Sequence, residues 1–264
     1  MHHTLKPRRM TEMLSFLAVA ACSGDGSSPL EPTSAHAVPL ARGAVIASPR
    51  VIPRDARPHG RTYGEWAAAW WQYVLSVPAG QNPLLDETGA DCAVDQSGHV
   101  FFLAGILNVS GTAVRTECVI PTGAMLFFPI VNTICTNEPP PLTPTDQLRP
   151  CAAGPIETAT NLVVEIDGTP VGGLERFRAQ SDLFGLTLPA DNLLGGQAGP
   201  CHFDPDVGAC VPYLAAADGF YLMLSPLSPG KHTLHIHGVM PAFGGFTLDV
   251  RYDPLTVVPR GGVS

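Results

Sequence analysis

Lysine is almost missing from this 264-residue chain, which contains only Lys6 and Lys231. Charged residues make up 14% of the sequence, and its formal net charge is −8. Proteins that bind nucleic acid or anionic membrane surfaces through electrostatics carry basic patches. The composition therefore argues against a nucleic-acid partner and against an electrostatic membrane footprint.

Several catalytic and nucleotide-binding motifs are missing as well. The sequence has no G-x-S-x-G elbow for a nucleophilic serine, no Walker A loop and no dinucleotide fingerprint. The apolar run near its start, Met13–Ala21, is much shorter than the roughly 20 residues that span a bilayer. These motifs therefore assign no catalytic residue and no organic cofactor.

Residues 1–21 are typical of a secretory signal peptide, because basic residues precede a short apolar run and small residues precede Cys22. The stretch Val19-Ala20-Ala21-Cys22 resembles the lipobox of bacterial lipoproteins, which implies that Cys22 is acylated after cleavage. We therefore expect an exported cell-envelope lipoprotein, anchored to a membrane by lipid on its periplasmic or outer-surface side. The alternative is ordinary secretion, with Cys22 removed or free.

Residues 22–60 are rich in Ser, Pro, Gly and Ala and predict a flexible tether. Alternatively, Val51-Ile52 could form a short edge strand instead of belonging to the tether. We expect one folded domain over residues 61–264, which is long enough to bury a substantial core.

Six further cysteines predict a disulfide framework, since their number is even and export favours oxidation. Proximity along the chain pairs Cys92 with Cys118, Cys135 with Cys151, and Cys201 with Cys210. Metal ligation by Cys201, His202 and Cys210 is the competing interpretation, although no C-x-x-C pair is present.

The stretch 62–77 predicts an amphipathic helix. Tyr63, Trp66, Trp70 and Tyr73 recur at helical spacing and form one aromatic stripe, which we expect to be buried. Thr62 and Glu65 predict a capping box at its start, and Pro78 ends it.

Two residues of this helix are candidates for ligand binding. Trp71 lies about 100° away from the stripe, which makes its ring the best candidate for an exposed platform. Glu65 could also act with Asp86 or Glu87 as a glycosidase pair. The commoner role of Asp86 and Asp91 is to accept hydrogen bonds from turn amides.

After this helix, short apolar runs alternate with frequent turn signals and predict a mainly β fold, an antiparallel β-sandwich or jelly-roll-like domain. Residues 99–103 and 114–120 suggest a hairpin, and Asp167-Gly168 suggests a second one. Residues 124–131 suggest a buried strand interrupted by Pro129. Residues 139–150 read as a proline-rich loop.

Two later strands predict a polar face with metal-binding chemistry. If residues 233–237 and 246–252 pair antiparallel with their apolar faces together, His235 and His237 share the other face with Asp249 and Arg251. Imidazole and carboxylate groups in this pattern suit zinc or copper, and His232 would lie nearby. The alternative is an ordinary polar strand face.

The segments Y-G-E-W-A-A-A-W-W-Q-Y, N-P-L-L-D-E-T-G-A-D-C and A-D-G-F-Y-L-M-L-S-P-L-S-P-G-K-H-T-L-H-I together resemble a set of uncharacterised exported bacterial proteins. The likeness covers residues 61–258; it implies one exported domain and no particular activity. We therefore expect a non-catalytic domain that binds a ligand, glycan or partner protein. The alternative is a metal-binding domain, with metal-dependent catalysis included, that uses His235, His237 and Asp249.

Overall fold

The computed structural model describes residues 51–107, 111–137, 143–193, 199–204 and 206–259. The predicted signal peptide (1–21), Cys22 and the tether up to residue 50 lie outside these residues, so the lipid anchor stays a prediction. No helix within the described ranges is long and apolar enough to cross a membrane.

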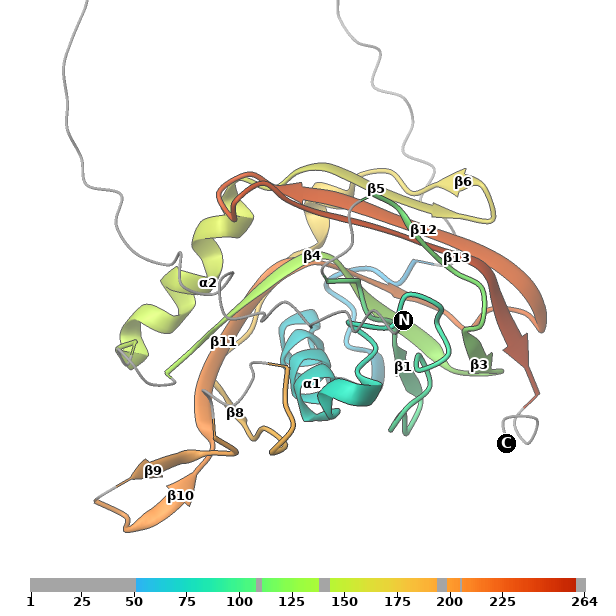
Figure 1. The fold of residues 1–264 in the computed structure, drawn as a ribbon. Coiled ribbons are helices and arrows are strands. Elements are labelled where there is room, and N and C mark those ends of the chain that lie inside the picture. Colours follow the sequence, from blue (N-terminus) through green and yellow to red (C-terminus); the bar gives the residue numbers. More distant parts are fainter. Residues whose placement is uncertain (1–50, 108–110, 138–142, 194–198, 205, 260–264) are drawn as a thin grey trace, which may run out of the picture. The chain divides into compact units, whose positions relative to one another are not determined.

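Two β-sheets form the framework (Figure 1). The first has the order β1-β4-β11-β7, and β8 also pairs with β11. Its strands are β1 (Val100–Phe102), β4 (Met125–Thr136), β7 (Arg178–Gln180), β8 (Phe184–Leu186) and β11 (Tyr213–Leu224). We call it the five-stranded sheet. As Pro129 predicted, the β4–β11 register shifts, between Phe220 and Tyr221.

The second, six-stranded sheet has the order β2-β13-β12-β5-β6, and β3 also pairs with β13. Its strands are β2 (Ala113–Arg115), β3 (Val119–Pro121), β5 (Thr160–Ile166), β6 (Thr169–Pro170), β12 (Gly230–Met240) and β13 (Phe246–Val258). The hairpin predicted at Asp167-Gly168 joins β5 to β6. Outside both sheets, β9 (His202–Asp204) and β10 (Ala209–Val211) form a hairpin of their own.

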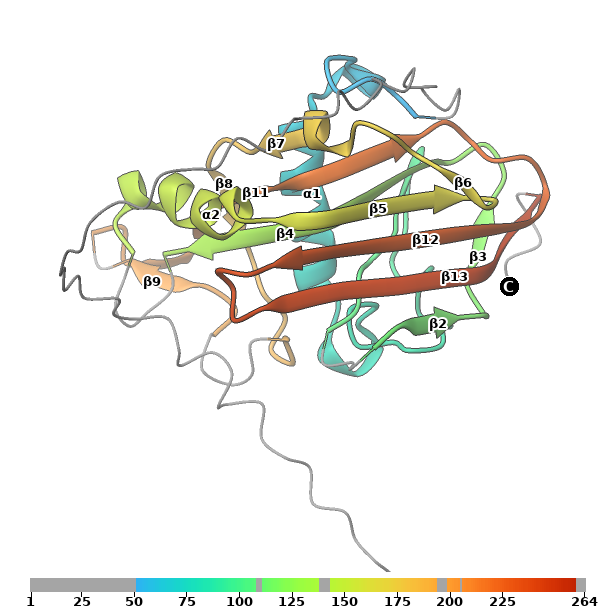
Figure 2. The same cartoon turned by 90° about the horizontal axis from the view of Figure 1, so that it is seen from above.

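The layers are sandwich-like and confirm a mainly β fold. The six-stranded sheet faces the five-stranded sheet, and helix α1 (Tyr63–Ser76) packs against the opposite face of the five-stranded sheet (Figures 1 and 2). Both sheets are mixed rather than wholly antiparallel, because β1 runs parallel to β4 and both β2 and β3 run parallel to β13.

The hairpin expected from residues 99–103 and 114–120 does not form, since these strands belong to different sheets. Arg115 gives the physical reason. It is fully buried beside β13, and its guanidinium needs several acceptors to replace water. Its partners are the Tyr252 hydroxyl and the main-chain carbonyls of Pro83, Asp86, Ala104 and Gly105, at 2.6–3.0 Å.

Helix α1 forms as predicted. The Thr62 side chain accepts a hydrogen bond from the Glu65 amide at 3.2 Å, and the Glu65 carboxylate accepts one from the Thr62 amide at 2.6 Å, which completes the capping box. The four stripe aromatics are all buried. Gly64 brings the helix against β7, where an added Cβ would collide with the Gln180 carbonyl.

The folded domain begins earlier than the predicted boundary at residue 61. Val51 forms an antiparallel bridge with Leu224, and the Ile52 amide donates to the Met223 carbonyl at 2.8 Å. The Tyr63 hydroxyl donates to the Ile52 carbonyl at 2.6 Å. Residues 51–60 therefore belong to the domain rather than to the tether.

A second helix, α2 (Leu148–Glu157), occupies sequence that includes part of the predicted proline-rich loop and packs against β4 and β11. Short 3₁₀ turns are η2 (Pro58–Gly60), η3 (Ala79–Gln81), η4 (Thr145–Gln147) and η5 (Leu174–Phe177).

The disulfides are Cys92–Cys118, Cys135–Cys151 and Cys201–Cys210, as proximity predicted. Three disulfides indicate an oxidising, extracytoplasmic environment.

Candidate functional site

The predicted histidine face exists on the outward side of the six-stranded sheet. In the β12–β13 register His237 lies opposite Asp249, and His235 lies opposite Arg251. His235 Nε2 is 2.9 Å from Asp249 Oδ1, and His237 Nδ1 is 3.7 Å from Asp249 Oδ2. Glu165 on β5 adds a carboxylate 3.5 Å from His235 Nδ1. The strand parity deduced from the sequence is therefore confirmed.

Hydrogen bonds within the protein already occupy this cluster. Burial alone would raise the pKa of Asp249, but hydrogen bonds from His235 and Thr112 outweigh it and hold this pKa below its usual value. Arg251 Nη2 lies 3.4 Å from His235 Nδ1, so Arg251, Glu165 and Asp249 all contact this ring. Within the described ranges, no group of three or more His, Cys, Asp or Glu side chains is arranged to hold a metal ion.

His232 lies apart from this cluster, on the inward face of β12. Its Nδ1 is 2.9 Å from Asp167 Oδ2, and its Nε2 is 2.9 Å from the Ser228 carbonyl and 3.2 Å from Ser228 Oγ. The order Ser–His–Asp resembles a catalytic triad. However, the nearer partner of Nε2 is the Ser228 carbonyl, so the ring links the turn at Asp167 to the turn at Ser228.

Glu65 and Trp71, the other predicted ligand-binding residues, have structural partners. Hydrogen bonds from the Thr62 amide and hydroxyl lower the pKa of Glu65, whose carboxylate completes the helix cap. Trp71 is partly buried and its ring packs edge-on against Trp70, so it is not a fully exposed platform. Its indole nitrogen, the Asn132 amide nitrogen and the Tyr221 hydroxyl are buried and make no hydrogen bond of standard geometry within the described ranges, but the Trp71 and Asn132 side chains both act on Tyr221 and lower its pKa against the larger effect of burial.

Asp86 fills the role that turn chemistry favours. Its carboxylate accepts hydrogen bonds from the amides of Thr88, Gly89 and Asp91 at 2.9 Å. Burial alone would raise the pKa of Asp86, but these bonds outweigh it and lower this pKa below its usual value. The glycosidase interpretation has no support from the position of this carboxylate.

Sequence reasoning missed a depression of about 300 Å³ beside the C-terminal half of α1, called here the helix depression. The Tyr73 and Phe102 rings stack in it at 5.5 Å, with 28° between their planes. Its lining residues are Gln72, Tyr73, Ser76, Asp95, Gln96, Ser97 and Phe102.

The walls of the helix depression are fixed. The Gln96 amide donates to the Phe102 carbonyl at 2.7 Å and accepts from the Phe102 amide at 3.1 Å. The Tyr73 hydroxyl donates to the Val94 carbonyl at 2.9 Å. Asp95 and Ser97 are exposed, and neither makes a side-chain hydrogen bond to another described residue.

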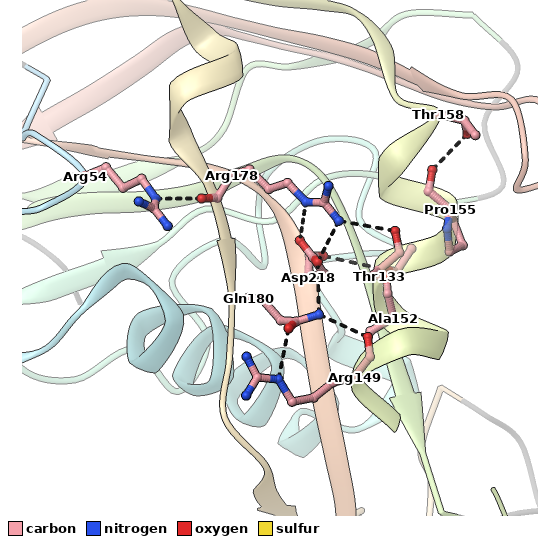
Figure 3. A network of polar contacts seen from close by, with 10 residues as sticks. Arg54, Thr133, Arg149, Ala152, Pro155, Thr158, Arg178, Gln180 and Asp218 are labelled. Carbon is pink, nitrogen blue, oxygen red and sulfur yellow. Dashed lines mark hydrogen bonds and ion pairs between the residues drawn. The ribbon is translucent and has the colours of Figure 1, made fainter. Parts of the chain in front are cut away.

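A second depression, of about 500 Å³, lies where β7, β11, α2 and the segment before α1 meet; we call it the arginine depression. Its central ion pair joins Arg178 to Asp218, and Figure 3 shows Arg178 and Gln180 pointing at this carboxylate. No local sequence pattern pointed to it, because its lining residues are far apart in the sequence.

No protein-family model, curated protein or solved structure matches this chain.

Proposed function

We propose that this chain is an exported, membrane-tethered domain of the cell envelope that binds a glycan, or a similarly hydroxyl-rich ligand, without catalysis. Three disulfides support export, and acylated Cys22 would supply the anchor. The observation that carries the binding role is the helix depression, where stacked aromatic rings meet a rim of uncharged and carboxylate groups.

The chemistry of this depression suits a sugar. Binding sites combine an apolar surface with a few polar groups that fix orientation. The partly exposed Phe102 ring can pack against the C–H face of a pyranose, while Asp95 accepts hydrogen bonds from hydroxyls and Ser97 donates or accepts them. Gln72 uses its amide nitrogen on the Gly185 carbonyl at 2.8 Å, which leaves its oxygen as a further acceptor.

The rigidity of the site favours binding. Gln96 and the Tyr73 hydroxyl hold β1 and the loop before it in place, so the backbone that carries Asp95 and Ser97 is already ordered when a ligand enters. Asp95 and Ser97 are exposed, so changing them leaves the core intact.

The test is ligand-observed NMR and calorimetry on the mature chain against a panel of neutral oligosaccharides. Asp95→Asn and Ser97→Ala should each weaken binding of a positive glycan roughly two- to tenfold, the range for one lost hydrogen bond. Ser97→Phe, which places a ring at the rim, should abolish binding. Asp55→Asn, whose side chain is 96% exposed elsewhere, is the matched control. Equal binding by parent, Ser97→Phe and control would refute this site.

The anchor is tested separately. Cys22→Ala should move the protein from the membrane fraction to the soluble fraction and should remove labelling by a fatty-acid analogue. Membrane association that survives this change, with no label on the parent, would contradict the tether.

A metal site on the histidine face is the second candidate, because both oxygens of Asp249 face imidazole nitrogens. A metal ion would have to replace these ring–carboxylate contacts. About one zinc or copper per purified chain, lost in His235→Ala and in His237→Ala, would favour this candidate. A metal content that both variants leave unchanged would remove it.

A further inference from the structure

The arginine depression has the chemistry of an anion site, and its construction begins at a buried carboxylate. The Asp218 side chain is 2% exposed, so its charge needs a partner. Arg178 supplies it through two hydrogen bonds, Nε to Oδ1 at 3.1 Å and Nη2 to Oδ2 at 3.0 Å. This pairing, with burial acting against it, raises the pKa of Arg178 above its usual value. Arg178 is thereby held in one orientation.

The surrounding residues reinforce that orientation. The Gln180 amide donates to Asp218 Oδ2 at 3.1 Å and to the Arg149 carbonyl at 3.0 Å, which links β7 to α2 (Figure 3). Arg178 Nη2 also lies 3.4 Å from the Ala153 carbonyl. The Nη1 group of Arg178 makes no hydrogen bond to any described residue.

Two more guanidinium groups line the same space with spare donors. Arg54 uses its Nε on the Arg178 carbonyl at 2.6 Å, and Asp55, its ion-pair partner at 3.6 Å, is 96% exposed. Arg176 uses its Nε on the Gly173 carbonyl at 3.3 Å and pairs with no carboxylate in the described part of the chain. Gly173 has a φ of +70°, and a Cβ there would collide with this guanidinium.

The seven lining residues carry a small net positive charge, which two carboxylates outside the lining, Asp55 beside Arg54 and Glu157 near Arg178, partly offset. Arg54, Arg176 and Arg178 contribute three positive charges, and Glu175 and Asp218 contribute two negative ones, so the lining sums to +1. The formal charge of the chain is −8. Asp218 is already neutralised by Arg178, which leaves Glu175 as the one lining carboxylate without a bonded arginine in the described part of the chain.

We propose that the arginine depression binds an oxyanion group, a carboxylate, sulfate or phosphate, carried by a ligand of the cell envelope. Guanidinium groups present planar pairs of N–H donors that match the oxygens of these anions, and charge-assisted hydrogen bonds are stronger than neutral ones. Arg178 is the fixed element, while Arg54 and Arg176 contribute donors from two other segments. This site is independent of the helix depression.

The experiment titrates the mature chain by calorimetry at low salt with three probes: an oligogalacturonate for carboxylate, a sulfated maltohexaose, which has no carboxylate, for sulfate, and inorganic phosphate. At least one probe should bind, and its affinity should fall as salt screens the charges. Arg176→Gln should weaken that binding about tenfold or more, and Arg54→Gln should weaken it in the same direction.

Arg57→Gln is the matched control, since it removes the same charge from an exposed side chain that does not line the depression. It should leave the affinity within about twofold, and all three variants should keep the parent's unfolding midpoint. Which probe binds identifies the oxyanion. The proposal is overturned if no probe binds, or if Arg57→Gln weakens binding as much as Arg176→Gln does.

Discussion

Strands β11 and β12 show how differently the two sheets use their residues. Every residue of β11 from Ala215 to Leu224 is buried, because the five-stranded sheet has the six-stranded sheet and α2 on one face and α1 on the other. From His232 onward β12 alternates between buried and half-exposed residues. A strand covered on one face alternates between buried and exposed residues, whereas a strand covered on both faces is buried throughout.

This difference decides what a polar residue must do. Asp218 on β11 is buried and is held by Arg178 and Gln180, whereas Asp249 on β13 keeps about a fifth of its side chain exposed. The first carboxylate therefore belongs to the interior, and the second belongs to a surface network. Four predictions test the contrast.

The largest effect is expected at Asp218. Asp218→Asn removes the charge that matches Arg178 and places an amide donor near that of Gln180, so the free energy of unfolding should fall by about 3 kcal/mol. Urea unfolding measures this. Asp182→Asn, in an exposed ion pair with Arg149, should show no measurable loss. Comparable losses in both variants would remove the distinction.

Gly219→Ala tests the tight packing of β11. An added Cβ would lie 2.6 Å from Asn132 Cβ and 2.7 Å from the Val131 carbonyl, so neighbouring backbone would have to move. We expect a loss of about 2 kcal/mol in thermal or urea unfolding. Gly80→Ala, where a Cβ meets nothing within 4 Å, should cost nothing. A stable Gly219→Ala variant would show that β11 tolerates extra volume.

The contribution of Asp249 to the free energy of unfolding should depend on pH. Its folded-state pKa lies below that of the unfolded chain, about 3.9, so the unfolded state binds more protons on acidification. The stabilisation is present above pH ~4 and is lost as the pH falls through the folded-state pKa. It should amount to less than about 1 kcal/mol, because the pair is partly solvated.

Unfolding curves of the parent and Asp249→Asn between pH 2 and 7 measure this difference. It should shrink toward pH 2. A constant difference at every pH would mean that the Asp249 charge adds nothing to stability.

The smallest effect is expected on the outward face of β5. Val163→Thr exposes its new hydroxyl to solvent and should change the stability by less than about 0.5 kcal/mol. Its neighbour Val164 is 1% exposed and points inward, so Val164→Thr buries the hydroxyl and should cost about 1–2 kcal/mol. Equal losses at both positions would contradict one-sided burial.

Local patterns explain what could be predicted from the sequence. The capping box at Thr62 and Glu65, the pairing of Cys92 with Cys118, and the shared face of His235 and His237 each depend on a short separation or on a strand period. The structure confirms these three features. The mainly β class followed from turn spacing in the same way.

The features that were missed depend on contacts between distant residues, or on tertiary packing that outweighs local helix propensity. Helix α2 contains Pro150, Gly154 and Pro155 within ten residues, which local propensity disfavours, yet its Leu148, Ala152 and Ile156 are buried. The arginine depression joins Arg54 to Arg178 across 124 positions and Arg178 to Asp218 across 40. A single sequence contains no signal for such contacts.

The hydroxyl of Tyr63 also connects the segment before α1 to the interior of the five-stranded sheet. It donates to the Ile52 carbonyl and accepts from the Met223 amide at 3.1 Å, beside the bridge from Val51 to Leu224. A force that pulls Val51 away from the domain therefore acts on an interior strand and on the first turn of α1 together. Release of this end breaks the bridge to Leu224 and the hydrogen bonds that Ile52 makes with Met223 and Tyr63.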